Sequence, residues 1–163
     1  MPSLSAEEVL HWNDTTARNW QRLLERHPEA LTLPCDVRGS ENAADLLQHI
    51  FAVELRYAQQ LRAEPITDYA DIPKSTLAEL YATHDLAMTK WRELLADPAY
   101  PWDEDIQLVT RSLGTLIGNR RTVLFHALLH GIRHYAQLAM LLRHAGIAAD
   151  FEMDYLMMGV RRG

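Results

Sequence analysis

Apolar residues recur every three or four positions along four long segments of the chain, which is the spacing of one buried face of an α-helix. Helices are expected at residues 6–27, 41–63, 76–96 and 119–145. Capping residues support these boundaries, because Ser5 stands three residues before Glu8, Ser40 precedes the second segment and Gly146 follows the last. Four amphipathic helices of this length predict an all-α fold, a four-helix bundle.

The stretch between the third and fourth predicted helices has a different pattern. Residues 99–118 contain apolar positions with Ser112 and Gly114 between them, which predicts a short β-hairpin before the last helix; the apolar residues are Ile106, Leu108, Leu113, Leu116 and Ile117. The tail, residues 147–163, carries aromatic residues and methionines that we expect to pack back on the bundle. The length of the chain predicts a single domain over residues 1–163.

Composition narrows the class of protein. The chain is 48% hydrophobic and 23% charged, as is typical of a soluble globular protein. A lone cysteine, Cys35, excludes an intrachain disulfide and favours a cytoplasmic location. The longest uncharged apolar stretch, residues 122–132, is shorter than the ~20 residues of a membrane helix, and no secretory signal is visible. The net charge of −6 weighs against a nucleic acid as partner, and the short apolar stretch weighs against a membrane.

Histidine is the unusual residue of this sequence. Eight are present, and the last predicted helix carries three of them four residues apart, His126, His130 and His134. Two of these belong to a seam with core-facing spacing, formed by Val123, Ala127, His130, His134, Gln137 and Leu141. Burying such polar groups without partners costs roughly 1–3 kcal/mol each. Two imidazoles at i and i+4 lie on one helix face, so a shared metal ion would satisfy them.

The spacing leaves alternatives open. His126 with His130 is as good a pair as His130 with His134, although only the second pair lies on the seam. His126 and His134 are about 12 Å apart along a helix, so all three cannot bind one ion. A third ligand would come from another helix, with His49 as first candidate and His84 as second. Three imidazoles with an open position are typical of catalytic zinc, and nickel, iron or copper also accept them. The alternative without metal is a core network of histidines hydrogen-bonded to one another and to Tyr or Gln.

Two segments resemble the helix motifs of the DinB-like family. They are Leu46–Glu54, which contains His49, and Leu128–Leu138, in which a histidine is followed four residues later by another and then by a glutamine. The resemblance implies an up-down-down-up bundle that often forms homodimers, with zinc or nickel held by His49, His130 and His134. The chain departs from the commoner motif at Tyr135-Ala136, where Arg-Gly is frequent.

What the resemblance implies about activity is broader. Similar proteins include thiol S-transferases and maleylpyruvate isomerases that use low-molecular-weight thiols, and one branch looks like metal-dependent hydrolases. The first hypothesis is therefore a metalloenzyme acting on a small molecule or thiol, with Gln137 orienting a ligand. The alternative is a non-catalytic stress-response or small-ligand-binding bundle.

No general base is evident from the sequence. Glu54 lies about 140° around the helix from His49, so it is not expected at the same site. Asp45 and Tyr57, four residues before and eight after His49, share its face better. His84 and His126 remain candidates for the pocket around the metal.

Overall fold

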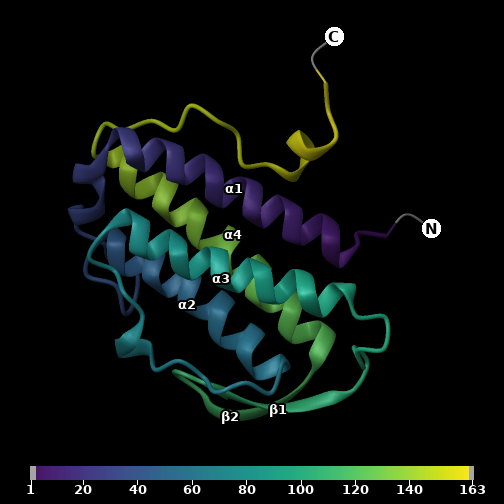
Figure 1. Cartoon of the computed structure of the whole chain (residues 1–163). Coiled ribbons are helices and arrows are strands. Elements are labelled where there is room, and N and C mark those ends of the chain that lie inside the picture. The colour runs from purple at the N-terminus through teal and green to yellow at the C-terminus, as the bar shows by residue number, and fades with distance from the viewer. Residues whose placement is uncertain (1–2, 162–163) are drawn as a thin grey trace.

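The computed structural model describes residues 3–161 and shows four long helices with a β-hairpin before the last one (Figure 1). The helices are α1 (Ala6–Arg26), α2 (Ala43–Leu61), α3 (Leu77–Ala96) and α4 (Arg120–His144). Short 3-10 turns lie in the connections and the tail, at η1 (Pro28–Thr32), η2 (Tyr69–Asp71) and η3 (Tyr155–Met158). The predicted helical bundle is confirmed, and each helix begins and ends within two residues of the predicted bound. The first two and last two residues of the predicted single domain lie outside the described range.

The start of α2 differs from the prediction. Asn42, not Ser40, caps this helix, and its side-chain oxygen accepts a hydrogen bond from the backbone nitrogen of Asp45 at 3.0 Å. The preceding backbone is held extended, because Cys35 N donates to Glu41 O at 2.9 Å and residues 34 and 42 form an antiparallel bridge. Because of these loop contacts, α2 begins two residues later than predicted. A capping pattern in the sequence does not reveal such contacts.

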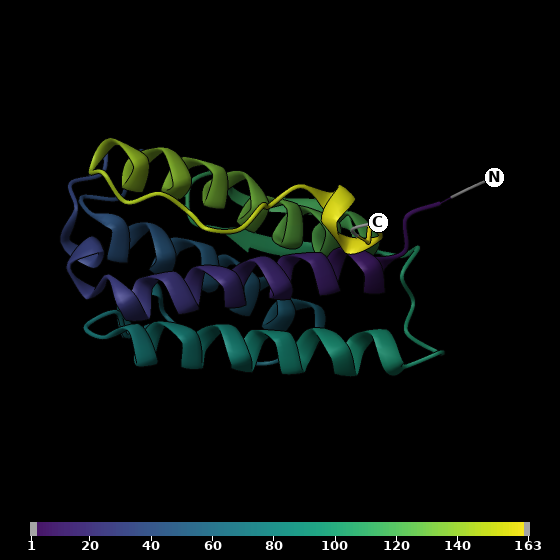
Figure 2. The same cartoon turned by 90° about the horizontal axis from the view of Figure 1, so that it is seen from above.

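Two clusters of buried apolar side chains reveal how the helices run. One joins the C-terminal halves of α1 and α4 to the N-terminal halves of α2 and α3, and includes Trp20, Leu46, Tyr81 and Leu138. The other joins the opposite halves, and includes Val9, Leu55, Trp91 and Leu124. Hence α1 and α4 run in one direction and α2 and α3 in the other, as Figure 2 shows. This is an up-down-down-up course.

The predicted hairpin is present and is fixed against α2. Strands β1 (Asp105–Thr110) and β2 (Gly114–Asn119) pair antiparallel, and Gly114 has a φ of +70°, a conformation that favours glycine. The side-chain amide of Gln60 pairs with the backbone of Val109, accepting from its nitrogen at 2.6 Å and donating to its oxygen at 3.2 Å. The hairpin therefore stands beside the C-terminal half of α2 (Figure 1).

The tail packs back on the bundle, as predicted. The indole of Trp12 donates to the backbone oxygen of Met153 at 2.8 Å, and the ring of Phe151 meets Trp20 edge-on at 5.1 Å between centroids. Within the described residues, none of the helices combines the length and the apolar composition needed to cross a membrane.

Candidate metal centre

Three histidines from two neighbouring helices converge at one side of the bundle. His49 lies on α2, and His130 and His134 lie one turn apart on α4. One ring nitrogen from each forms a group whose members all lie within 4.8 Å of one another. The Nε2 atoms of His130 and His134 are 3.1 Å apart. Both of these rings are buried, whereas His49 is half-buried. We refer to these residues as the three-histidine cluster.

Neighbouring side chains fix the tautomer of His134. The carbonyl oxygen of Gln137 lies 2.5 Å from Nδ1, so Nδ1 carries the proton and donates it. The guanidinium of Arg133 lies 3.2 Å from Nε2, and a guanidinium only donates, so Nε2 presents a lone pair. This lone pair, which a metal ion would take, accepts from Arg133, and His130 Nε2 lies 3.1 Å from the same atom.

The electrostatics of the cluster keep the imidazoles neutral. Burial, together with nearby histidine and arginine charges, lowers the pKa of His49 to about 4 and that of His130 to about 2. Burial also lowers the pKa of His134, partly opposed by the hydrogen bond to Gln137. Neutral imidazole is the form that binds a metal ion, so no proton has to leave near pH 7.

The donor set fits a divalent ion such as zinc or nickel. Two nitrogens that each lie 2.0–2.1 Å from one zinc ion are at most about 4.2 Å apart, and the Nε2 atoms of His130 and His134 meet this limit. The other nitrogen of His130, Nδ1, is buried and has no hydrogen-bond partner within the described chain, so no contact there competes for the ring's orientation. Metal-binding histidines commonly donate their second nitrogen to a carbonyl oxygen, as His134 does to Gln137.

Three residues that the sequence suggested for the surroundings of the metal lie outside the three-histidine cluster: His126, Tyr57 and Asp45. The exposed ring of His126 lies 5.5 Å from that of His130 and meets Tyr57 edge-on at 5.6 Å. Tyr57 lines a cleft that also contains His49. Asp45 has other partners, since it accepts from Lys74 at 2.5 Å and from the backbone nitrogen of Glu41 at 3.0 Å.

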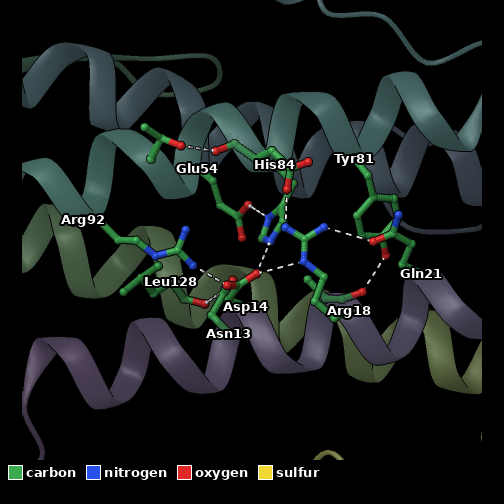
Figure 3. Close-up of polar contacts among 12 residues, drawn as sticks. Asn13, Asp14, Arg18, Gln21, Glu54, Tyr81, His84, Arg92 and Leu128 are labelled. Atoms are coloured by element: carbon green, nitrogen blue, oxygen red, sulfur yellow. Dashed lines mark hydrogen bonds and ion pairs between the residues drawn. The ribbon is translucent and has the colours of Figure 1, made fainter.

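His84, the second candidate for a third ligand, belongs to a separate polar group. It lies on α3, and α4 packs mainly against α1 and α2, so His84 cannot reach the histidines of α4. Its Nδ1 lies 2.7 Å from Glu54 Oε2 and its Nε2 lies 3.1 Å from Asp14 Oδ1. Figure 3 shows the two carboxylates on either side of the ring. We call Asp14, Glu54 and His84 the buried ionic chain.

The charges of the buried ionic chain stabilise one another. Burial by itself lowers the pKa of His84, but the two carboxylates outweigh it and raise this pKa to about 9. Burial likewise opposes ionisation of Asp14, yet His84, Arg18 and Arg92 bring its pKa down to about 2. Both His84 and Glu54 are 0% exposed. The buried ionic chain thus forms a charged layer inside the bundle, between the two apolar clusters.

Sequence reasoning missed this buried ionic chain, although one signal was available. Glu54 follows Leu47 by seven residues and Ile50 by four, so it falls on the buried stripe of α2. His84 falls likewise among the buried residues of α3. Two ionisable residues on buried stripes of adjacent helices are expected to pair, because an unpaired buried charge is costly.

A small cleft of about 40 Å³ opens beside His49. Its walls come from α2, η2 and the end of β1, and they include Arg56, Tyr57, Tyr69 and Arg111. The cleft gives one side of the three-histidine cluster a route toward solvent.

Comparison with known proteins adds the family. A sequence model described as the DinB family matches residues 1–158, nearly the whole chain. Among curated proteins, no sequence matches.

Proposed function

This chain belongs to the DinB family, and we propose that it is a metal-dependent enzyme that acts on a small molecule or a low-molecular-weight thiol. In this proposal His49, His130 and His134 hold one divalent ion, zinc or nickel. The reaction is a thiol transfer or a hydrolysis, two of the classes that the family resemblance implies.

One observation carries the proposal: three neutral imidazoles from two helices meet, and one of them, His49, lines a cleft. Such a ligand set leaves a position open for water or substrate, unlike the closed sites that only stabilise a fold. When bound, the ion supplies Lewis-acid chemistry and makes a bound water or thiol a nucleophile near neutral pH.

The protein's own residues orient and enclose this site. Gln137 holds the His134 ring in the tautomer whose Nε2 lone pair points into the cluster. Tyr57 and Tyr69 line the cleft, and in this proposal their hydroxyl groups meet the substrate. Burial raises the pKa of both phenols, so they act as hydrogen-bond donors rather than as bases near pH 7.

A second candidate function is a non-catalytic small-ligand-binding or stress-response bundle. It is favoured by the hydrogen bonds that already join His130, His134 and Gln137, because such a network satisfies polar groups without an ion. Homodimer formation and a cytoplasmic location stay predictions in either case.

Metal content measured on tag-free protein tests the proposal. We expect about one zinc or nickel per chain by ICP-MS, lost in the His130→Ala/His134→Ala double variant and in His49→Ala. Circular dichroism should show that the helices persist, and His27→Ala, which changes an exposed histidine on the α1–η1 connection, should keep the metal. Absence of metal from the wild type even after reconstitution, or one equivalent retained by the ligand variants, would refute the metal site and leave the second candidate.

A further inference from the structure

The cleft beside the three-histidine cluster is lined by cations and by no carboxylate. Its polar walls comprise His49, Arg56, Tyr57, Gln60, Tyr69 and Arg111, besides Thr110. A further arginine, Arg133, reaches His134 from α4. In a chain with net charge −6, three arginines around one site form a local region of opposite sign.

None of these three arginines has an acidic partner within the described residues. By contrast, seven other arginine and lysine side chains form salt bridges: Arg18, Arg26, Arg62, Lys74, Lys90, Arg92 and Arg121. Asp45, one turn before His49 on α2, is already paired with Lys74. The positive charge at the cleft is therefore not neutralised by the protein itself.

Each guanidinium is also held in place by neutral contacts. Arg111 lies over the ring of Tyr69, 4.1 Å from its centroid, and Arg56 donates to the backbone oxygen of Thr67. The loop that carries Thr67 is itself fixed, because its backbone nitrogen donates to Gln59 at 2.9 Å. Contacts of this kind position a charge without cancelling it, as a binding site for an anion requires.

We propose that Arg111 and Arg133 bind an oxyanionic group, a carboxylate or a phosphate, of a small molecule seated in this cleft. The planar guanidinium donates two parallel hydrogen bonds to such a group. The phenol of Tyr69 supplies a neutral donor in the same cleft. The assignment of this molecule as the substrate rests on the proposed function, whereas binding of the anion does not.

Metal and anion binding are linked through Arg133. Its guanidinium donates a hydrogen bond to the lone pair of His134 Nε2. A metal ion would take this same lone pair. An ion bound there would release Arg133 toward the cleft, so the metal-loaded protein should bind the anion more tightly than the metal-free protein.

The test titrates acetate and inorganic phosphate, at constant ionic strength, into metal-free and zinc-loaded protein followed by NMR. We expect saturable shifts of the Arg111 and Arg133 side-chain Nε–H signals. The variants Arg111→Gln and Arg133→Gln should each weaken binding by about tenfold, the effect of one charged hydrogen bond. Arg143→Gln, a change to an exposed arginine on α4, is the matched control and should bind as the wild type does. Acetate alone, phosphate alone or both in the wild type identifies the group.

Different results separate this inference from the proposed function. Equal binding by Arg111→Gln, Arg133→Gln and Arg143→Gln overturns the anion site, as does equal binding of the neutral analogue acetamide. If zinc binds and the anion result fails, the metal site stands without it. If zinc does not bind but arginine-dependent anion binding persists, the anion site stands and the proposed enzyme fails.

Discussion

A β-carbon placed on Gly131 would lie 2.8 Å from the side-chain nitrogen of Asn13. The same atom would lie 3.2 Å from the carboxylate of Glu54. Asn13 Nδ2 also donates to the backbone oxygen of Leu128 at 2.9 Å. The missing side chain at Gly131 thus lets α4 approach α1 and α2 closely, between two members of the three-histidine cluster.

The first prediction is that Gly131→Ala destabilises the protein by about 1–3 kcal/mol, the usual cost of overpacking a tight interior. The contacts in the way are a buried amide and a buried carboxylate, which have little room to move. Urea unfolding measures the change. Gly159→Ala is the matched control, since a β-carbon there meets nothing within 4 Å and the residue has a φ of −129°. Equal unfolding midpoints for the two variants would show that the close approach of α4 to α1 and α2 at Gly131 does not affect stability.

The second prediction concerns the pair of Glu54 and His84. Glu54→Ala should cost about 3–5 kcal/mol, because it removes the fully buried one of the two carboxylates that pair with the imidazolium of His84. The double variant Glu54→Ala/His84→Ala should lose less than the sum of the two single losses, since the interaction is removed only once. A double-mutant cycle in urea measures this coupling. Additive losses would contradict the pairing, and the exposed pair His27 and Glu29 provides a control cycle in which little coupling is expected.

The third prediction is the pH dependence of stability. The pKa of His84 is raised from 6.5 to about 9 in the folded protein, so folding holds its proton more tightly. The stabilisation is complete below pH 6.5 and is lost as the pH rises through 9. Unfolding free energy measured from pH 6.5 to 9.5 should therefore fall more steeply in the wild type than in His84→Gln. His144→Gln, at the end of α4, is the control and should follow the wild type. Parallel curves for all three proteins would contradict a protonated His84.

The fourth prediction is that Gln137→Leu weakens metal binding by about 10- to 100-fold, the usual effect of losing the partner of a metal-binding histidine. The side chain keeps its size but no longer accepts the proton of His134 Nδ1. Competition with a chromophoric chelator measures the affinity. Gln107→Leu, at an exposed position of β1, is the matched control. An affinity for zinc equal to that of the control would show that Gln137 does not orient the ligand.

Much of the fold follows from local patterns in the sequence. The helical period of apolar residues places the four helices, because burying one face requires that period whatever the neighbours are. The capping pair of Ser5 and Glu8 is visible for the same reason, since both hydrogen bonds are made within one turn. Asn42 replaces Ser40 as the cap of α2 because strand-like contacts across the preceding loop, which lie outside any capping pattern, decide where that helix begins.

The sequence by itself determined that His130 and His134 share a face, because a spacing of four residues gives that result in any helix. Only the tertiary structure decided between His49 and His84 as the third member. The up-down-down-up course sets α2 beside α4, so His49 meets the histidine pair, while α3 packs against α2 and α1. His84 therefore faces Glu54 and Asp14 instead. Helical periodicity describes one helix at a time, and which helices become neighbours depends on the packing of the whole bundle.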